Sequence, residues 1–324
     1  MELDNKEIYR QFAEQEQLPL FMQPWWLDAV TAPDGKQWDV LLAYNRQGEA
    51  EAAMPYMLRQ RMGFRYVLMP QQTQIGGVGL SGKIKNDSHA QENIVKWLIE
   101  QLGKLRLDYY YQQYSVDSPI PALLAARGFT TRERVTYRIE RPANIDAVVR
   151  SFSYNKRRQL KKAASLVVDF DLTPQEFYAF HSDCLKEKHQ TIRYSWELFK
   201  NIYQYSTARN QGQVIALRSD TDSRLVAAAF VVWDEQQMYY LIPVLLSSAG
   251  RSGAGTRIAF ECIKLAQKKG IAFDFEGSNI PSVANHYRQF GSTPVKYYSV
   301  EKKTNPLFSL LLYCNRVKEK WQRK

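Results

Sequence analysis

Two acidic residues on one short apolar stretch, Asp274 and Glu276, have a spacing that could support acid–base chemistry. They lie in the segment IAFDFEGSNI, 271–280, which otherwise has the composition of a buried strand. Residues two apart on a strand point to the same side, so we expect both carboxylates on one face, with Phe273 and Phe275 on the other. A carboxylate in a gap of the sheet could bind an ammonium group or take its proton, because an attacking amine must be neutral. The alternative for each acid is an ion pair with a nearby Arg or Lys.

A glycine-rich loop, LSSAGRSGAGTRIAF at 246–260, is the candidate site for a phosphate group. Glycines let the backbone approach a ligand closely, and the amides at the start of the helix expected at 252–269 attract anions. The alternative is a flexible loop that only leads into a helix. The residues that we assign to a phosphate-bearing cofactor are Gly250, Arg251, Gly253, Gly255 and Thr256.

The run NKRRQLKKAA, 155–164, gathers Lys and Arg side chains within about two helical turns, with no acid among them. Arg157 and Lys161 share one helix face, as do Arg158 and Lys162. Like charges repel, so a phosphate-bearing ligand would relieve this cluster. The alternative is a helix face that is simply solvated. We take Arg157, Arg158 and Lys161 as candidates for substrate contact.

Two tyrosines stand at positions where chemistry or substrate binding is plausible. Tyr287 follows His286 on the helix expected after the Gly-Ser-Asn-Ile-Pro turn, and a tyrosine there could protonate a leaving thiolate. Tyr239 and Tyr240 lie on one strand with opposite orientations, so one of them is expected to line the cleft. We assign Tyr239 to substrate binding; a purely structural role is the alternative for each of these residues.

The elements that must position these residues form an α+β pattern with a mixed sheet flanked by helices. Three strands are expected in series, at 212–219, 224–234 and 237–246. The helix at 252–269 connects the last of them to the strand FDFEG, 273–277, which makes a βαβ unit. These two strands should therefore be parallel, and their parting is where a cofactor could fit.

Composition sets limits on the class of protein. The chain has 324 residues and a net charge of +11, with 45% hydrophobic and 13% aromatic residues, which supports packed cores in two domains. The charge predicts an anionic partner (nucleic acid, a phosphorylated small molecule or an acidic membrane surface), or else only a basic surface. Cys184, Cys262 and Cys314 are odd in number and far apart, so neither a disulfide framework nor a metal site is expected. With no signal peptide and no spanning segment in the pattern, we expect a cytoplasmic protein of undetermined oligomeric state.

The two halves of the chain close in similar ways. LDYYYQQYSVDSPIPALLAARGFTTRERVTYRIE and IAFDFEGSNIPSVANHYRQFGSTPVKYYSVE both run in the order strand, proline-bearing turn, helix, Gly, Thr and long strand. Gly128 and Gly291 correspond, and they are half the chain apart. The pattern predicts a duplicated architecture with domains at 1–144 and 145–324, the second holding the active cleft and a basic C-terminal helix. Chance likeness of two αβ closures is the alternative.

The order of elements resembles the GNAT acyltransferase fold used twice in tandem, and its details resemble the FemABX-like branch of acetyltransferases. The resemblance covers nearly the whole chain and is carried by four stretches: LFMQPWWLDAV, SFSYNKRRQLKKAASLVVDF, RSGAGTRIAFECIKLAQKKGIAFDFEGS and HYRQFGSTPVKYYSV. One position departs from the family pattern, since Gly250 stands where a typical GNAT loop has Gln or Arg, and Arg251 comes one residue later.

The resemblance implies an enzyme that transfers an acyl or aminoacyl group from acyl-CoA or aminoacyl-tRNA to an amine, without a metal. The acceptor would be a small molecule or a cell-envelope precursor, and tRNA would be a partner of the Fem-type reaction. His189 and Arg193, in KEKHQTIRYSW at 186–196, resemble the segment that borders the acceptor pocket in relatives.

The sequence supports two further expectations besides the acyltransferase. The tail NPLFSLLLYCNRVKEKWQRK, 305–324, could dock on an anionic membrane or pack its apolar side on the body of the protein. The rival hypothesis is a binding protein that keeps the fold without catalysis and recognises nucleic acid or an anionic lipid.

Overall fold

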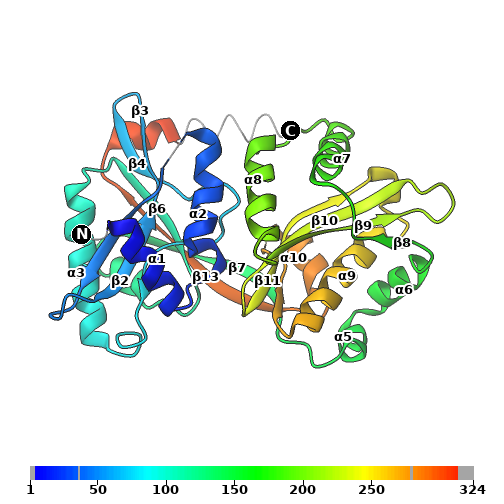
Figure 1. Cartoon of the computed structure of the whole chain (residues 1–324), viewed down its shortest axis with the longest axis horizontal. Coiled ribbons are helices and arrows are strands. Elements are labelled where there is room, and N and C mark those ends of the chain that lie inside the picture. Colours follow the sequence, from blue (N-terminus) through cyan, green and yellow to red (C-terminus); the bar gives the residue numbers. More distant parts are fainter. Residues whose placement is uncertain (1–3, 36, 278–279, 313–324) are drawn as a thin grey trace. The chain divides into compact units, whose positions relative to one another are not determined.

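The chain divides into two compact units, each described here by itself. The computed structural model describes residues 4–35, 37–277 and 280–312 (Figure 1). Unit 1 comprises Met1–Arg134 with Tyr297–Lys324, and unit 2 comprises Val135–Lys296. The division falls inside two long strands, β7 (Thr130–Ile139) and β13 (Thr293–Lys303). The chain therefore passes from one unit to the other within regular strand and without a linker.

Unit 1 contains a three-stranded antiparallel sheet and a second set of strands. The first sheet has the order β1-β2-β5, with bounds Asp39–Tyr44, Ala50–Tyr56 and Gly79–Leu80. In the second set, β3 (Leu58–Arg61) pairs antiparallel with β4 (Phe64–Val67), which runs parallel to β6 (Tyr109–Tyr114). The last residues of β13 pair antiparallel with β6.

Unit 1 contains the helices α1 (Asn5–Gln15), α2 (Pro24–Thr31), α3 (Ser88–Lys104) and α4 (Ile120–Ala125), and residues 306–312 are also helical. Pro24 occupies the first turn of α2, where a missing backbone N–H costs no hydrogen bond. Along α3, Ile94, Leu98 and Leu102 are buried because they recur on one face of the helix.

Unit 2 is built on a mixed sheet in which neighbouring strands run β7-β12-β11-β10-β9-β8. The bounds are Val167–Asp169 for β8, Gly212–Arg218 for β9, Leu225–Trp233 for β10, Gln237–Leu245 for β11 and Ala272–Asp274 for β12. The pairs β8–β9, β9–β10, β10–β11 and β7–β12 are antiparallel, whereas β11 and β12 are parallel, as the βαβ pattern predicted. β10 is buried on both of its faces, which explains its continuous apolar run.

Helices cover both faces of this sheet (Figure 1). α9 (Ala254–Lys269) packs with α5, α6 and α10 (Pro281–Arg288) around the main core of unit 2, where Ile258, Phe152 and Phe290 are buried. α7 (Pro174–Lys186) and α8 (Trp196–Thr207) contribute Phe177 and Phe199, which meet Phe230 of β10. Thr173 and Glu176 form a capping box at the start of α7.

The basic run 155–164 begins within α6 (Tyr154–Lys162), which directly follows a separate short helix, α5 (Ile145–Ser151). Ser153 has extended backbone and caps α6 by accepting a hydrogen bond from the Lys156 amide. Its own N–H donates to the carbonyl of Gln289, at 2.8 Å. A hydrogen bond across 136 residues of sequence therefore ends one helix and starts the next, which local periodicity could not indicate.

The duplication seen in the sequence corresponds to two β–α–β closures, β6–α4–β7 and β12–α10–β13. Gly128 and Gly291, which precede the closing strands, both have left-handed backbone, with φ of 78° and 72°. Each closing strand pairs with a strand from the other half of the sequence, because β7 pairs with β12 and β13 pairs with β6. This exchange is why the compact units differ from the division at 144/145 that the sequence suggested, and why residues 297–312 group with unit 1.

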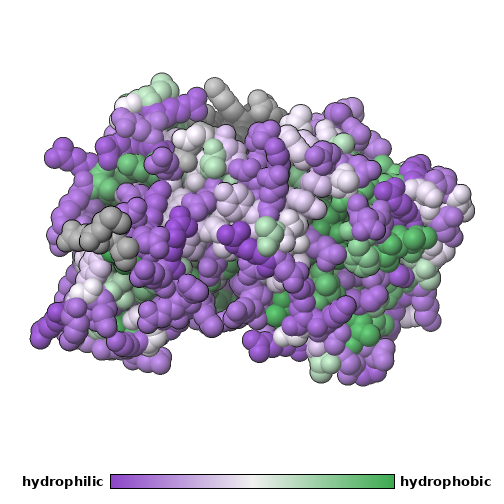
Figure 2. All heavy atoms as spheres, viewed as in Figure 1, coloured by the Kyte–Doolittle hydropathy of each residue, from purple (hydrophilic) through white to green (hydrophobic). Residues whose placement is uncertain are grey.

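The predicted α+β class, with a mixed sheet flanked by helices, is confirmed. On the face shown in Figure 2, hydrophobic side chains gather over the region of α6, β8 and α9. Val167 and Phe170, at the edge strand β8 and just after it, are exposed. Among the described residues, no helix has the length and apolar character needed to cross a membrane. The cations of the predicted basic tail, Arg316, Lys318, Lys320, Arg323 and Lys324, lie outside the described residues.

Candidate acyl-transfer site

β11 and β12 part after a short stretch of pairing. They are joined at Gln237–Ala272, Met238–Phe273 and Tyr239–Asp274, after which β12 ends while β11 continues to Leu245. The register between β10 and β11 shifts at the same level, between Phe230/Ile242 and Val232/Tyr239, so β11 carries one extra residue. A bulge of this kind bends its strand. The backbone edge of β11 beyond Tyr239 is thereby left without a β12 partner.

A cavity of about 420 Å³ occupies this split. Its walls come from β11, the first turns of α9, the residue after β12, and α10. The lining residues are Lys188, Tyr240, Pro243, Val244, Leu245, Gly255, Ile258, Ala259, Phe275, Ser282, Val283, His286 and Tyr287. The volume suits a small-molecule ligand or the arm of a larger one.

Aromatic rings form one wall of this cavity. Phe275 stacks on Tyr287 with ring centroids 4.5 Å apart, and Tyr240 meets Phe275 edge-on at 6.1 Å. Burial, followed by the charges of Glu276 and Asp274, raises the pKa of Tyr287 to about 12. The predicted Tyr287 therefore lies at the cavity with its phenol protonated at neutral pH, where it is a hydrogen-bond donor.

Of the five loop residues that we assigned to a phosphate-bearing cofactor, all of them described by the structure, only Gly255 lines the cavity. Gly253 begins α9 with φ of 87°, and a Cβ there would lie 2.2 Å from the Gln159 carbonyl oxygen of α6. Gly253 thus permits close packing of two helices. The Thr256 hydroxyl is buried and donates to Gln159 Oε1 at 2.6 Å.

The other two loop residues lie at the surface beside α6. Gly250 ends the short 3-10 helix Ser247–Ala249, and it is exposed. Arg251 is also exposed, and its carbonyl oxygen accepts a hydrogen bond from Lys162 Nζ at 2.7 Å.

Asp274 is 1% exposed and anchors β12 to β7. It accepts hydrogen bonds from the Thr136 hydroxyl and from the Glu276 amide at 2.7 Å, and it forms an ion pair with Arg138 at 3.4 Å. Burial raises the pKa of the Asp274 carboxyl, while Thr136, Arg138 and the amide oppose that rise. These contacts match the ion-pair alternative considered from the sequence, and Asp274 does not line the cavity.

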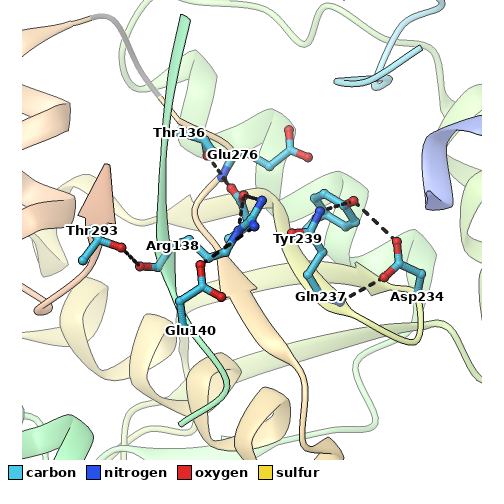
Figure 3. A network of polar contacts seen from close by, with 9 residues as sticks. Thr136, Arg138, Glu140, Asp234, Gln237, Tyr239, Glu276 and Thr293 are labelled. Carbon is cyan, nitrogen blue, oxygen red and sulfur yellow. Dashed lines mark hydrogen bonds and ion pairs between the residues drawn. The ribbon is translucent and has the colours of Figure 1, made fainter. Parts of the chain in front are cut away.

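Glu276 does not continue the strand alternation, because its backbone is left-handed, with φ of 63°. Figure 3 shows its side chain directed away from the Asp274–Arg138 pair. Burial and then the nearby Asp274 charge raise the pKa of Glu276 well above its ordinary value. The Glu276 charge contributes to the raised pKa values of Tyr287 and Tyr239. This carboxyl therefore lies within electrostatic reach of Tyr287 in the cavity wall.

Tyr240, rather than the predicted Tyr239, lines the cavity. Adjacent strand residues face opposite ways, and Tyr239 is fully buried on the side of Asp274. Its hydroxyl accepts a hydrogen bond from Gln237 and donates one to Asp234 Oδ2 at 3.5 Å (Figure 3). Tyr239 is therefore held in a polar network on the other face of the sheet.

The predicted substrate-binding cations lie apart from the cavity lining. The Arg157 guanidinium donates to the carbonyl oxygens of Arg150 and Phe152, which closes the end of α5. Arg158 and Lys161 are exposed on α6. His189 and Arg193 are exposed between α7 and α8, and Lys188, beside His189, is the member of that segment that lines the cavity.

Sequence reasoning did not include Lys156 and His286 among the site residues. Lys156 is only 2% exposed, and its Nζ lies 3.1 Å from Nδ1 of His286, which lines the cavity. The signal was present in the spacing, since Lys156, Leu160 and Ala163 recur at i, i+4 and i+7 and therefore share the packing side of α6. Within the described residues no group of three or more His, Cys, Asp or Glu side chains could hold a metal ion.

Comparison with known proteins relates one region of the chain to a family and the whole chain to solved structures. Residues 147–287 match the family described as an acetyltransferase (GNAT) domain. The fold matches FemX with a TM-score of 0.70 and 13% identity, over 96% of this chain and 98% of that one. It matches a tandem GNAT protein from the clavulanic acid biosynthesis pathway with a TM-score of 0.56 and 12% identity, over 94% and 97% of the two chains.

A third solved structure with the same fold is L-PGS from Bacillus licheniformis, with a TM-score of 0.56 and 12% identity over 97% of this chain and 96% of that one. No match was found among curated proteins. The second half of this chain is thus similar to acetyltransferase (GNAT) domains, and the whole chain shares its fold with FemX and with a tandem GNAT protein. The expected tandem GNAT-like fold is thereby confirmed, and the match over residues 147–287 supports the expected GNAT-type acyltransferase.

Proposed function

We propose that the chain transfers an acyl or aminoacyl group from a phosphate-bearing donor, acyl-CoA or aminoacyl-tRNA, to an amine. The observation that carries the proposal is the cavity in the split between β11 and β12, at the start of α9. The donor's reactive arm would lie along the unpaired edge of β11, whose backbone groups can hydrogen-bond an extended ligand. The Gly255 turn at the start of α9 would face the donor's phosphates.

The reaction needs a neutral amine, which attacks the acyl carbonyl as the bond to the leaving atom breaks. Glu276 is the base for this step in our proposal, because its raised pKa makes the carboxylate a stronger proton acceptor near neutral pH. Tyr287 donates a hydrogen bond to the leaving atom from the cavity wall. Asp274 holds β12 in place through Thr136 and Arg138. It also accepts a hydrogen bond from the backbone amide of Glu276 and so positions that residue.

The acceptor in this proposal is an amine on a cell-envelope precursor or another small molecule. Its support is the fold shared with FemX and with L-PGS, together with the net charge of +11, which favours anionic donors and acceptors. The GNAT family match favours this enzyme over the non-catalytic binding protein considered from the sequence.

The test supplies purified protein with acetyl-CoA and, separately, with a mixture of aminoacyl-tRNAs, each with a panel of amines. Amide products are measured by mass spectrometry, and donor binding is measured by calorimetry. We expect one donor class to be consumed. Neither binding nor consumption of either donor class would overturn the proposal.

A further inference from the structure

Lys156 is a buried ammonium group behind the cavity wall. Its side chain is 2% exposed, and its Nζ lies 4.3 Å from the centre of the Phe290 ring. It donates to the Thr256 hydroxyl oxygen at 3.3 Å, and it lies 3.1 Å and 3.3 Å from the two ring nitrogens of His286. No carboxylate forms an ion pair with it in the described part of the chain.

The surroundings disfavour a permanent positive charge at this position. Lys156 lies in the first turn of α6, and its partner Thr256 lies in the first turn of α9, so two positive helix ends meet there. The ionisable groups on the packed elements include His286 and Tyr287 on α10. On α9, Glu261 pairs with Arg257 at 2.7 Å and with Lys264 at 2.8 Å. Burial lowers the pKa of Lys156 to about 8, so its proton is held loosely near neutral pH.

His286 connects this ammonium group to the cavity. It lines the cavity from the last turn of α10 and retains exposed surface, whereas Lys156 has almost none. Partial burial and then the Lys156 charge lower the pKa of His286 to about 4, so the imidazole is neutral at neutral pH. A neutral imidazole has one N–H and one accepting nitrogen, which is what a proton relay requires.

Tyr287 is poorly suited to protonate the leaving atom of the donor. Its pKa of about 12 lies well above that of an ordinary thiol, so a departing thiolate would not draw its proton away. It can steady the leaving atom by hydrogen bonding, and the proton itself must come from another group.

We propose that Lys156 and His286 form a proton-delivering pair for the leaving group of the donor, an inference that rests on the proposed function. As the bond between the acyl carbon and the leaving sulfur or oxygen breaks, the leaving atom keeps the electron pair and takes the N–H proton of His286. The Lys156 ammonium passes a proton to the accepting ring nitrogen. The proton lost by the attacking amine goes through Glu276 to water, and water restores the proton of Lys156.

The experiment uses the full chain and compares wild type with Lys156→Arg, Lys156→Met, His286→Gln and Tyr287→Phe. Turnover is followed against pH with the donor that wild type consumes. The expected result is a fall in turnover above about pH 8, as Lys156 loses its proton, and a ~100-fold loss in His286→Gln and both Lys156 variants. Lys156→Arg matters because arginine keeps the charge and cannot give up its proton.

A second readout does not depend on catalysis. The chain has four histidines, so a ring-carbon NMR titration can follow His286 by itself. Its midpoint should rise from about 4 in Lys156→Met, because the repelling charge is gone, and stay low in Lys156→Arg. The loss of turnover in the His286 and Lys156 variants should also be smaller with an S-acyl 4-nitrothiophenol donor, because its thiolate leaves without needing a proton.

The outcomes separate the two proposals. If the wild type is active and His286→Gln and Lys156→Arg keep its turnover, the proposed proton pair is wrong. The same holds if only Tyr287→Phe lowers turnover. In both cases the proposed acyl-transfer function is unaffected. An unmoved His286 midpoint in Lys156→Met would also overturn the pair. A wild type that consumes no donor would remove both proposals.

Discussion

At the scale of single residues, Asp274 and Glu276 lie in different surroundings although they are only two residues apart. Asp274 is held by Thr136, Arg138 and the Glu276 amide, whereas Glu276 is directed elsewhere with a raised pKa. The sequence predicted that both acids share a face. The structure separates them because the left-handed backbone of Glu276 ends the strand alternation. Strand periodicity alone cannot reveal such a turn.

Glu276→Gln should lower turnover and raise stability at neutral pH. The folded state raises the pKa of this carboxyl, so ionised Glu276 destabilises the fold above its unfolded pKa, and glutamine removes that effect. The gain in Tm should be present at pH 7.5 and vanish near about pH 4, where the carboxyl is protonated in both states. Glu235→Gln, at an exposed turn, is the control and should change neither the turnover nor the Tm. A lower Tm for Glu276→Gln at pH 7.5 would contradict this account.

Lys156→Met should stabilise the protein at pH 7 while lowering its turnover. The shift of the lysine pKa from 10.5 to about 8 corresponds to roughly 3 kcal/mol of destabilisation when the amine is charged. Because the folded pKa is lowered, that penalty is fully present below pH 8 and fades as pH rises toward 10.5. Chemical denaturation at pH 7 and pH 10 measures the difference. An equal effect at both pH values would show that packing, and not charge, governs this position.

At the scale of elements, the site depends on where β11 and β12 stop pairing. The sequence predicted their parallel arrangement from the βαβ order, and β9 to β11 fall where alternation and turns placed them. The extra residue that bends β11 was not predictable, because it depends on the register of β10. The break between α5 and α6 depends in the same way on a contact with distant Gln289.

Val283→Trp should block the cavity without unfolding the protein. Val283 is a partly exposed lining residue on α10, so a larger ring would fill the split. Asn285→Trp, exposed on the same helix and outside the lining, is the matched control. Donor affinity measured by calorimetry should fall by at least ~10-fold in the first variant only, since the new side chain would exclude the ligand arm. Equal affinity in the two variants would place the donor elsewhere.

Gly253→Ala should destabilise the protein more than Gly270→Ala. Both glycines have left-handed backbone at the ends of α9, so alanine is strained at either position, by ~1–2 kcal/mol. A Cβ at Gly253 would also collide with the Gln159 carbonyl oxygen at 2.2 Å, whereas nothing lies within 4 Å at Gly270. Urea unfolding of the two variants isolates the contact of α6 with α9. Equal losses would mean that this contact is not tight.

At the scale of the whole chain, the duplicated closures exchange their last strands. The sequence predicted the duplication from Gly128, Gly291 and the shared element order, but it placed the division at 144/145. Strand pairing partners far apart in sequence leave no local pattern, so the crossing of β7 and β13 was not visible. The fragment 145–324 therefore lacks Thr136 and Arg138, the partners of Asp274. It should show no cooperative thermal transition by circular dichroism, whereas a fragment that folds alone would contradict the exchange.

The central claim, that the acyl donor binds in the split between β11 and β12, is tested most directly by hydrogen exchange. Backbone amides are compared in free protein, with saturating acetyl-CoA and with aminoacyl-tRNA. The account predicts slower exchange at 240–245 of β11 and at the first turn of α9 with one of the two donors. Unaltered exchange there, with protection confined to unit 1 or absent, would contradict it.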